Sequence, residues 1–302
     1  MDVGRELGLV AGLVDKRKSD GLMVAVSASR AMCAEMYATL SSHERRWLRA
    51  AAVAQSHPKA VVTGRAAARL TNMWVVATSE ETVELMLPSG GVPQRSRWAE
   101  GVSYHRGALA PHEIGYIEAY GGFAVTTPIR TAIDIATRHG FAEGIVAFDW
   151  LLASRKVTRD ELRATVDAMR DKKGVAVVRK VLAHAVANSQ SPYESYARAL
   201  LICAGLFPTT QAPIGPYLVD LLIGLVVIEI DGKVKYDGTT YRPVAETLLR
   251  EREREVQIQN SGYVVRRGET GRPATGPGGV RRGDHDGVGR CRVGLTMASG
   301  ET

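Results

Sequence analysis

Long apolar runs and paired cysteines are both missing from this 302-residue sequence. No window approaches the roughly eighteen continuous apolar residues that a membrane-spanning helix needs, and charged residues are spread through the amino-terminal end. We therefore expect no transmembrane segment and no secretory signal, and we assign the chain to the cytoplasm. The three cysteines, Cys33, Cys203 and Cys291, are far apart and lack metal-ligand spacing, which fits a reducing compartment and argues against a zinc module.

Aromatic residues are also scarce, at 6%, whereas the apolar fraction of 45% and the charged fraction of 24% are those of a globular protein. The sequence has no Gly-rich phosphate loop between a strand and a helix, so nucleotide hydrolysis has no visible site. The formal net charge of +7 is compatible with DNA or another polyanion as partner, without requiring one. The length allows two domains with a core each.

The first part of the chain divides into two segments. Residues 1–41 have scattered apolar positions without a sustained period, and we expect a poorly defined segment that holds at most a remnant winged helix. Residues 42–189 alternate between helical and strand patterns, starting at "SSHERRWLRAAAVAQS", where a serine cap precedes an acid in the first turn. This second segment is predicted to be a helical and stranded α/β region.

One helix of that region is marked at both ends. In "VTTPIRTAIDIATRHG", Thr127 is a candidate cap, Pro128 takes the first helical position, and Gly140 ends the helix. Arg130 and Asp134 lie four residues apart, where side chains meet on a helix. We predict a surface ion pair there, without a catalytic role.

Beyond Leu206 the apolar period changes from helix to strand. A helix from Pro192, strand-like segments, the helix "PVAETLLREREREVQIQNSGY" and a last strand "YVVRR" predict a small mixed sheet flanked by helices over residues 190–267. Gly, Arg and Pro dominate residues 268–302, which we predict to be disordered. Their composition also suggests GC-rich sequence read in another frame, so a frameshift near Gly268 is a hypothesis. The predicted fold class is α/β, of the α+β kind.

Three acids interrupt the most apolar stretch of the sequence, "YLVDLLIGLVVIEIDGKVKY". Asp220, Glu229 and Asp231 stand among Val, Ile and Leu, and a buried carboxylate without a partner is costly. If Gly224 turns the chain, a hairpin brings Asp220 opposite or diagonal to Glu229, while Asp231 shares a strand face with Glu229. Clustered carboxylates repel one another, so the three acids require a positive partner.

A hard divalent cation, Mg²⁺ or Mn²⁺, meets this need, because it is bound through carboxylates and keeps waters that can be activated. The three acids are its predicted ligands. Lys233 and Lys235 follow closely, and a lysine beside a metal orients water or stabilises an oxyanion in phosphoryl transfer. Glu194, on the preceding helix, is a further candidate for this site.

A structural interpretation of the same residues stays open. Asp231 and Gly232 can form a turn, and Glu229 can pair with an arginine of "REREREV". Burial of Glu229 against Arg250 or Arg254 would weigh heavily against catalysis.

The stretch "VDLLIGLVVIEIDGKVKY", with "SPYESYARALL" before it and "REREREVQIQNSGYVVRR" after it, resembles the PD-(D/E)XK nuclease superfamily, particularly the branch similar to very-short-patch-repair endonucleases. The resemblance implies a restriction-endonuclease-like sheet in which Asp220 is the first metal ligand and Glu229 the second. The common position of the catalytic lysine, two residues after the second acid, holds Asp231 here. We therefore assign that role to Lys235, with Lys233 as the rival.

The earlier segments "HPKAVVTGRAAARL", "VELMLP", "GVSYHRGAL" and "FAVTTPIRTAIDIA" resemble antitoxin-type proteins of the abortive-infection, type IV toxin-antitoxin family. That resemblance implies a DNA-binding winged helix at the amino end and a helical and stranded middle. The combined expectation is a metal-dependent DNA endonuclease-like protein with DNA, and a cognate toxin, as partners and no membrane. Two alternatives stay open: a non-catalytic DNA-binding antitoxin or transcriptional regulator with a degenerate nuclease domain, and a purely structural interaction protein.

Overall fold

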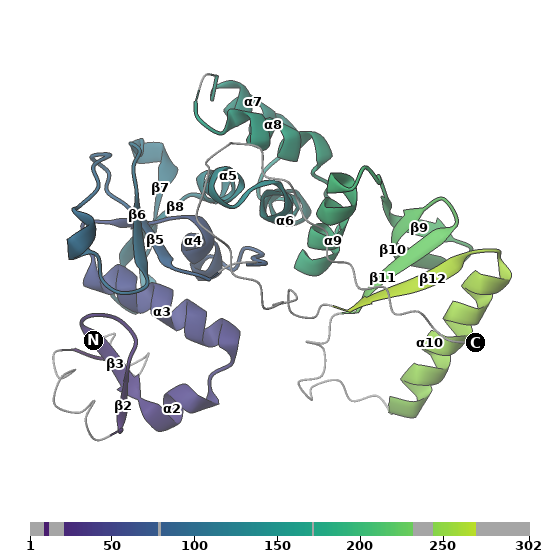
Figure 1. The fold of residues 1–302 in the computed structure, drawn as a ribbon, viewed down its shortest axis with the longest axis horizontal. Coiled ribbons are helices and arrows are strands. Elements are labelled where there is room, and N and C mark those ends of the chain that lie inside the picture. Colours follow the sequence, from purple (N-terminus) through teal and green to yellow (C-terminus); the bar gives the residue numbers. More distant parts are fainter. Residues whose placement is uncertain (1–8, 12–20, 78–79, 171, 232–243, 270–302) are drawn as a thin grey trace, which may run out of the picture.

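The computed structural model describes residues 9–11, 21–77, 80–170, 172–231 and 244–269. Within them the strands form three sheets, of three, five and four strands in chain order. A group of helices lies between the five-stranded and the four-stranded sheet (Figure 1). The fold is mixed α/β, as predicted. No helix of the described residues has the length and apolar character needed to cross a bilayer.

The first sheet is antiparallel and has the order β1-β3-β2. Its strands are β1 (Leu9–Ala11), β2 (Met23–Ala25) and β3 (Arg30–Cys33), and they are followed by α2 (Ala34–Thr39) and α3 (Ser42–Ser56). Residues 1–8 and 12–20 of the segment expected to hold a remnant winged helix lie outside the described residues. That expectation stays a prediction.

Helix α3 begins at the predicted serine cap. Ser41 Oγ accepts a hydrogen bond from the Glu44 backbone N–H at 3.3 Å, and Glu44 Oε2 accepts one from the Ser41 backbone N–H at 2.7 Å. These two bonds satisfy backbone donors that a helix start leaves unpaired. Further along α3, Leu48 packs with Met32 of β3, so the helix covers the first sheet.

The second sheet is mixed and has the order β6-β5-β4-β8-β7. Its strands are β4 (Val61–Val62), β5 (Val83–Met86), β6 (Val102–His105), β7 (Ile114–Ile117) and β8 (Phe123–Thr126). Helix α4 (Gly64–Leu70) follows β4, and three 3-10 turns connect the strands: η1 (Arg95–Arg97), η2 (Pro111–Glu113) and η3 (Ala119–Gly121). Pairs β5–β6 and β4–β8 are parallel, whereas β4–β5 and β7–β8 are antiparallel.

Four helices follow the second sheet: α5 (Pro128–His139), α6 (Phe141–Ala153), α7 (Arg159–Asp167) and α8 (Val175–His184). Helix α5 starts at Pro128 and is capped at its end by Gly140 with φ 88°, as its sequence predicts. Thr127 takes the predicted cap position, but its side chain makes no capping hydrogen bond. The largest cluster of buried apolar side chains lies among these helices and includes Ile145, Phe148 and Leu151, each 0% exposed.

The pair Arg130 and Asp134 forms, but the prediction that it lies on the surface is wrong. Arg130 Nε donates to Asp134 Oδ1 at 3.1 Å, and Asp134 is only 4% exposed. Arg138 also contacts Asp134 at 3.1 Å, Arg130 contacts Glu113 at 3.0 Å, and Thr63 Oγ1 donates to Asp134. Spacing along a helix predicts which side chains meet, but not which face the sheet covers.

The third sheet has the order β12-β11-β10-β9 and lies at the carboxyl-terminal end of the described chain (Figure 1). Its elements are α9 (Pro192–Cys203), β9 (Thr209–Ile214), β10 (Tyr217–Ile223), β11 (Val226–Asp231), α10 (Val244–Asn260) and β12 (Val264–Glu269). Neighbours β9, β10 and β11 are antiparallel, whereas β12 runs parallel to β11. The last strand continues two residues past Arg267, and the predicted disordered tail otherwise lies outside the described residues.

The two helices of this unit have different neighbours. Helix α9 packs Ala199 and Ile202 into the helical core that includes α6. Helix α10 packs Ile258, 2% exposed, against Val219 and Val227 of the sheet.

Candidate functional site

The turn between β10 and β11 brings two of the predicted acids together. Gly224, at φ 57°, lies in this turn, where a left-handed backbone suits glycine. The ladder pairs Leu221 with Ile228, so the next pair in the same register is Asp220 with Glu229. Asp220 Oδ2 accepts a hydrogen bond from the Ile230 backbone N–H at 2.8 Å, which fixes this carboxylate against β11.

Glu229 has a cationic partner on α10. Arg254 Nη2 donates to Glu229 Oε1 at 2.8 Å and to the Leu218 carbonyl oxygen at 2.7 Å. The side chain of Glu229 is 18% exposed and that of Arg254 is 33% exposed. This is the ion pair that the structural interpretation predicts, and it weighs against catalysis. The side chain of Arg250, the other arginine considered as a partner, lies outside the described part.

Glu194 joins the cluster from the first turn of α9. Ser191 caps this helix by accepting from the Glu194 backbone N–H at 3.1 Å. The Glu194 carboxylate, in a residue 6% exposed, accepts from the Gln190 backbone N–H at 3.0 Å and from Gln211 Nε2 at 3.2 Å. The acid is thus held between the helix start and β9.

Electrostatic interactions couple the carboxyl groups of Glu194, Asp220 and Glu229. Burial raises the pKa of Glu194, and the nearby charge of Asp220 raises it further. Burial and Asp220 likewise raise the pKa of Glu229, while Arg254 lowers it and does not fully compensate. Asp220 therefore acts on both neighbours, and the cluster favours either a bound proton or a cation.

Gln211 is a site residue that the sequence did not reveal. Its backbone has φ 50°, an uncommon value for a residue other than glycine. The ladder pairs Val219 with Ala212 and Leu221 with Thr210, which places Gln211 across from Asp220. Backbone strain at such a position is often held for a function. A glutamine in a strand carries no sequence signal of this conformation.

The remaining predicted residues are less well defined. Asp231 ends β11, and its backbone is paired to β12, but its side chain lies outside the described part. Lys233 and Lys235 also lie outside the described residues, so their assigned roles stay predictions.

The carboxylate oxygens of Asp220 and Glu229 are ligands of the type that Mg²⁺ and Mn²⁺ prefer. No group of three or more His, Cys, Asp or Glu in the described part of the chain is arranged to hold a metal ion. Mg²⁺, however, needs only one or two carboxylates, because water and phosphate oxygens complete its shell. Asp220 and Glu229 meet that requirement. Arg254 already supplies positive charge at one of the carboxylate oxygens, Glu229 Oε1.

A second buried acid lies in the five-stranded sheet. Glu84 of β5 is 2% exposed; its Oε2 accepts from the Arg65 backbone N–H at 2.7 Å, and its Oε1 lies 3.2 Å from Nε2 of both His105 and His139. Burial by itself raises the pKa of Glu84, but the contacts with His105 and His139 and the charge of Arg138 bring it well below the usual range. The paired contacts of this acid indicate a structural role.

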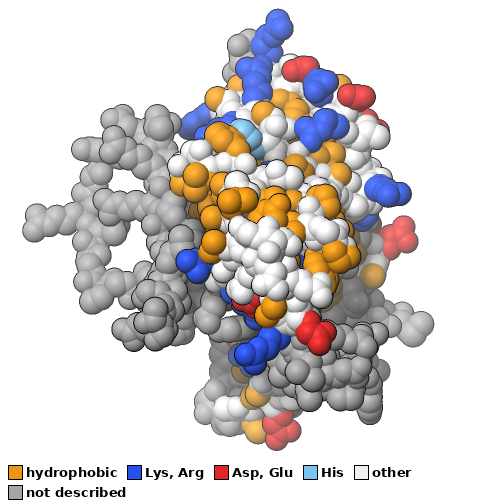
Figure 2. All heavy atoms as spheres, turned by 90° about the vertical axis from the view of Figure 1, so that its right-hand side faces the viewer, with side chains coloured by type: hydrophobic (Ala, Val, Ile, Leu, Met, Phe, Trp, Pro, Cys, Tyr) orange, Lys and Arg blue, Asp and Glu red, His pale blue; other side chains and the backbone are white. Residues whose placement is uncertain are grey.

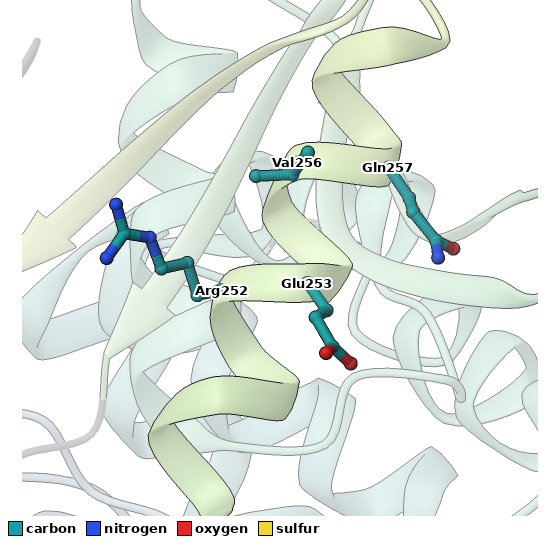
Figure 3. A pocket seen from close by; sticks show the side chains of 4 residues that line it. All are labelled: Arg252, Glu253, Val256 and Gln257. Carbon is teal, nitrogen blue, oxygen red and sulfur yellow. The ribbon is translucent and has the colours of Figure 1, made fainter. Parts of the chain in front are cut away.

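Two surface features lie on the third sheet and α10. Apolar side chains gather on the face of the molecule shown in Figure 2, and the exposed apolar residues of β11 and β12 include Val226 and Val264. An open hollow of about 310 Å³ lies on α10 and is lined by Arg252, Glu253, Val256 and Gln257 (Figure 3). None of the three acids lines it.

No family model matches the chain. Two proteins of Mycobacterium tuberculosis are similar to it, the uncharacterized protein MT2308 of strain CDC 1551 / Oshkosh and the uncharacterized protein Rv2248 of strain ATCC 25618 / H37Rv. Each is 24% identical over 189 residues, which covers 62% of this chain and 67% of the relative.

Proposed function

We propose that the unit formed by α9, β9–β12 and α10 hydrolyses DNA phosphodiesters with the help of a divalent cation. The observation that carries this proposal is the convergence of Asp220, Glu229 and Glu194, which come from two adjacent strands and a helix start. The element order of the unit, a helix, three antiparallel strands, a helix and a parallel strand, supports it as well.

Each residue of the cluster has a separate role in the proposed hydrolysis. Asp220 and Glu229 would hold Mg²⁺ or Mn²⁺, which supplies an activated water and stabilises charge on the phosphate. Gln211 and the start of α9 fix the carboxylate of Glu194 beside Asp220, where it can hold a water or a proton. Asp231 would assist at the cation, and Lys235 would stabilise the charge that develops on the phosphate oxygens.

The alternative is a DNA-binding antitoxin or transcriptional regulator whose nuclease-like unit does no chemistry. The 2.8 Å contact between Glu229 and Arg254 favours it, because a paired acid needs no metal. Asp231 at the usual lysine position favours it too. A cognate toxin would then be a partner, and exposed apolar side chains such as Leu225, Val226 and Val264 are of the kind found at protein contacts.

The deciding experiment measures cleavage of single-stranded, duplex and mismatched DNA with Mg²⁺ or Mn²⁺ and with a chelator. Glu229→Gln and Asp220→Asn keep the shape of each acid and remove its charge. Glu253→Gln is the matched control, since Glu253 is an exposed acid of the hollow on α10 (Figure 3). Metal-dependent cleavage that is lost in the first two variants and kept in the third supports the nuclease.

The alternative replaces the proposal if the unchanged protein cuts no DNA and if it and its three variants bind duplex DNA with equal affinity. If the protein does cut DNA, Lys235→Ala tests the assignment of the lysine, with Lys233→Ala as its comparison. A nuclease that survives Lys235→Ala and fails on Lys233→Ala would move the role to the rival residue.

A further inference from the structure

Arg254 holds one carboxylate oxygen of Glu229, which is a predicted metal ligand. Its Nη2 lies 2.8 Å from Glu229 Oε1 and 2.7 Å from the Leu218 carbonyl oxygen, so one guanidinium nitrogen bridges β10 and β11. The guanidinium carbon lies 6.0 Å from the centre of the Tyr217 ring, within the range of a cation–π contact. Tyr217 is in turn fixed by a hydrogen bond from its hydroxyl to Gln257 Oε1 at 2.5 Å.

The same oxygen cannot serve two cations well. A divalent ion coordinates a carboxylate oxygen directly, at a little over 2 Å, and a guanidinium in hydrogen-bond contact with that oxygen would repel the ion. An ion that takes Glu229 Oε1 therefore requires Arg254 to leave that oxygen. Its side chain is 33% exposed, so the guanidinium has a path away from the strands.

We propose that Arg254 is a positioning residue that holds Glu229 ready until a divalent cation replaces it, and that the released guanidinium then binds a DNA phosphate. The first step requires only that the acids bind a cation. The second step rests on the proposed function.

A phosphate suits the released side chain. The planar fork of arginine donors matches phosphate oxygens as well as carboxylate oxygens. Arg254 is hydrogen-bonded to Glu229, a predicted metal ligand. A short movement of its guanidinium therefore brings it next to a DNA phosphate that coordinates the same cation. The contact that offsets part of the negative charge at Glu229 thus becomes a contact to the substrate.

The first test measures Mn²⁺ affinity by calorimetry at about pH 8, well above the pKa of a free carboxyl group. Arg254→Ala removes the competitor and is expected to bind Mn²⁺ about fivefold more tightly, the size of a partly exposed ion pair. Arg252→Ala is the matched control, because Arg252 is exposed and lies two positions from Arg254, a spacing at which side chains of a helix do not face each other. It is expected to leave the affinity unchanged.

Equal or weaker Mn²⁺ binding by Arg254→Ala overturns the proposal, and so does a full chain that binds no Mn²⁺. Thermal unfolding checks that the variant is folded. If the alanine variant does not fold, Arg254→Gln retains a donor for the Leu218 carbonyl oxygen and is read by the same criterion.

The second test measures affinity for a DNA duplex with Ca²⁺, which also binds carboxylates, and with a chelator. Arg254→Ala is expected to lose about tenfold in affinity with Ca²⁺, the value of one charge-assisted hydrogen bond, and nothing with the chelator. An equal loss in both conditions, or no loss, overturns the phosphate step. Absence of cleavage by the unchanged protein would remove the proposed function without affecting the Mn²⁺ result, so the two failures are distinguishable.

Discussion

Gly64, the first residue of α4, provides a sharp test of the buried Glu84 cluster. Its φ is 57°, and a Cβ added there would lie 2.1 Å from Glu84 Oε2, an oxygen that already accepts from the Arg65 backbone N–H. Gly64→Ala therefore forces a left-handed alanine, which costs about 1–2 kcal/mol. It also displaces a buried carboxylate from a charged hydrogen bond worth about 1.5–3 kcal/mol.

The sum is a loss of about 2.5–5 kcal/mol, a large part of the roughly 5–15 kcal/mol that stabilise a typical domain. Urea unfolding should show the loss directly, and the melting temperature should fall by about 10 °C. Gly205→Ala is the matched control, since Gly205 also has a positive φ, of 82°, but nothing lies within 4 Å of its added Cβ. If Gly64→Ala costs no more than Gly205→Ala, the close approach to Glu84 is not as described.

Three further predictions concern the polar groups of the fold. Gln211→Gly relieves the left-handed strain but removes the amide that fixes Glu194, so unfolding free energy should hold or rise by up to about 1 kcal/mol while any cleavage activity falls. The lowered pKa of Glu84 contributes stability that is fully present above the unfolded pKa of about 4.3 and is lost as the pH falls toward the folded pKa. In urea unfolding, the difference in unfolding free energy between Glu84→Gln and the unchanged protein should therefore shrink as the pH is lowered. Asp149→Ala leaves Arg198, bonded to it at 2.7 Å, as a buried unpaired charge, and should cost about 3–5 kcal/mol by the same method.

Local chemistry predicted the helix ends and the hairpin well. Ser41 with Glu44, and Pro128 with Gly140, mark α3 and α5 because the capping groups are neighbours in the sequence. The opposition of Asp220 and Glu229 was equally accessible, since a turn at Gly224 and a strand period of two fix it.

Contacts between distant segments were not accessible in the same way. The burial of Asp134 depends on Thr63, which is 71 residues earlier, and the conformation of Gln211 depends on its place beside the acids. The arginine run of α10 restricted the partner of Glu229 to a few candidates, but only the packing of α10 on the sheet selects Arg254.

Helix α9 has a consequence for how this protein can be divided. Its start carries Glu194, which belongs to the acidic cluster, while Ala199 and Ile202 are buried in the helical core beside α6 (Figure 1). A fragment cut at Gln190 would keep the acids but uncover that apolar side, and a fragment ending before it would leave a hole in the helical core. Recombination that exchanges the unit of α9, β9–β12 and α10 therefore has to exchange α6 with it. The helical core and this unit are expected to be inherited together.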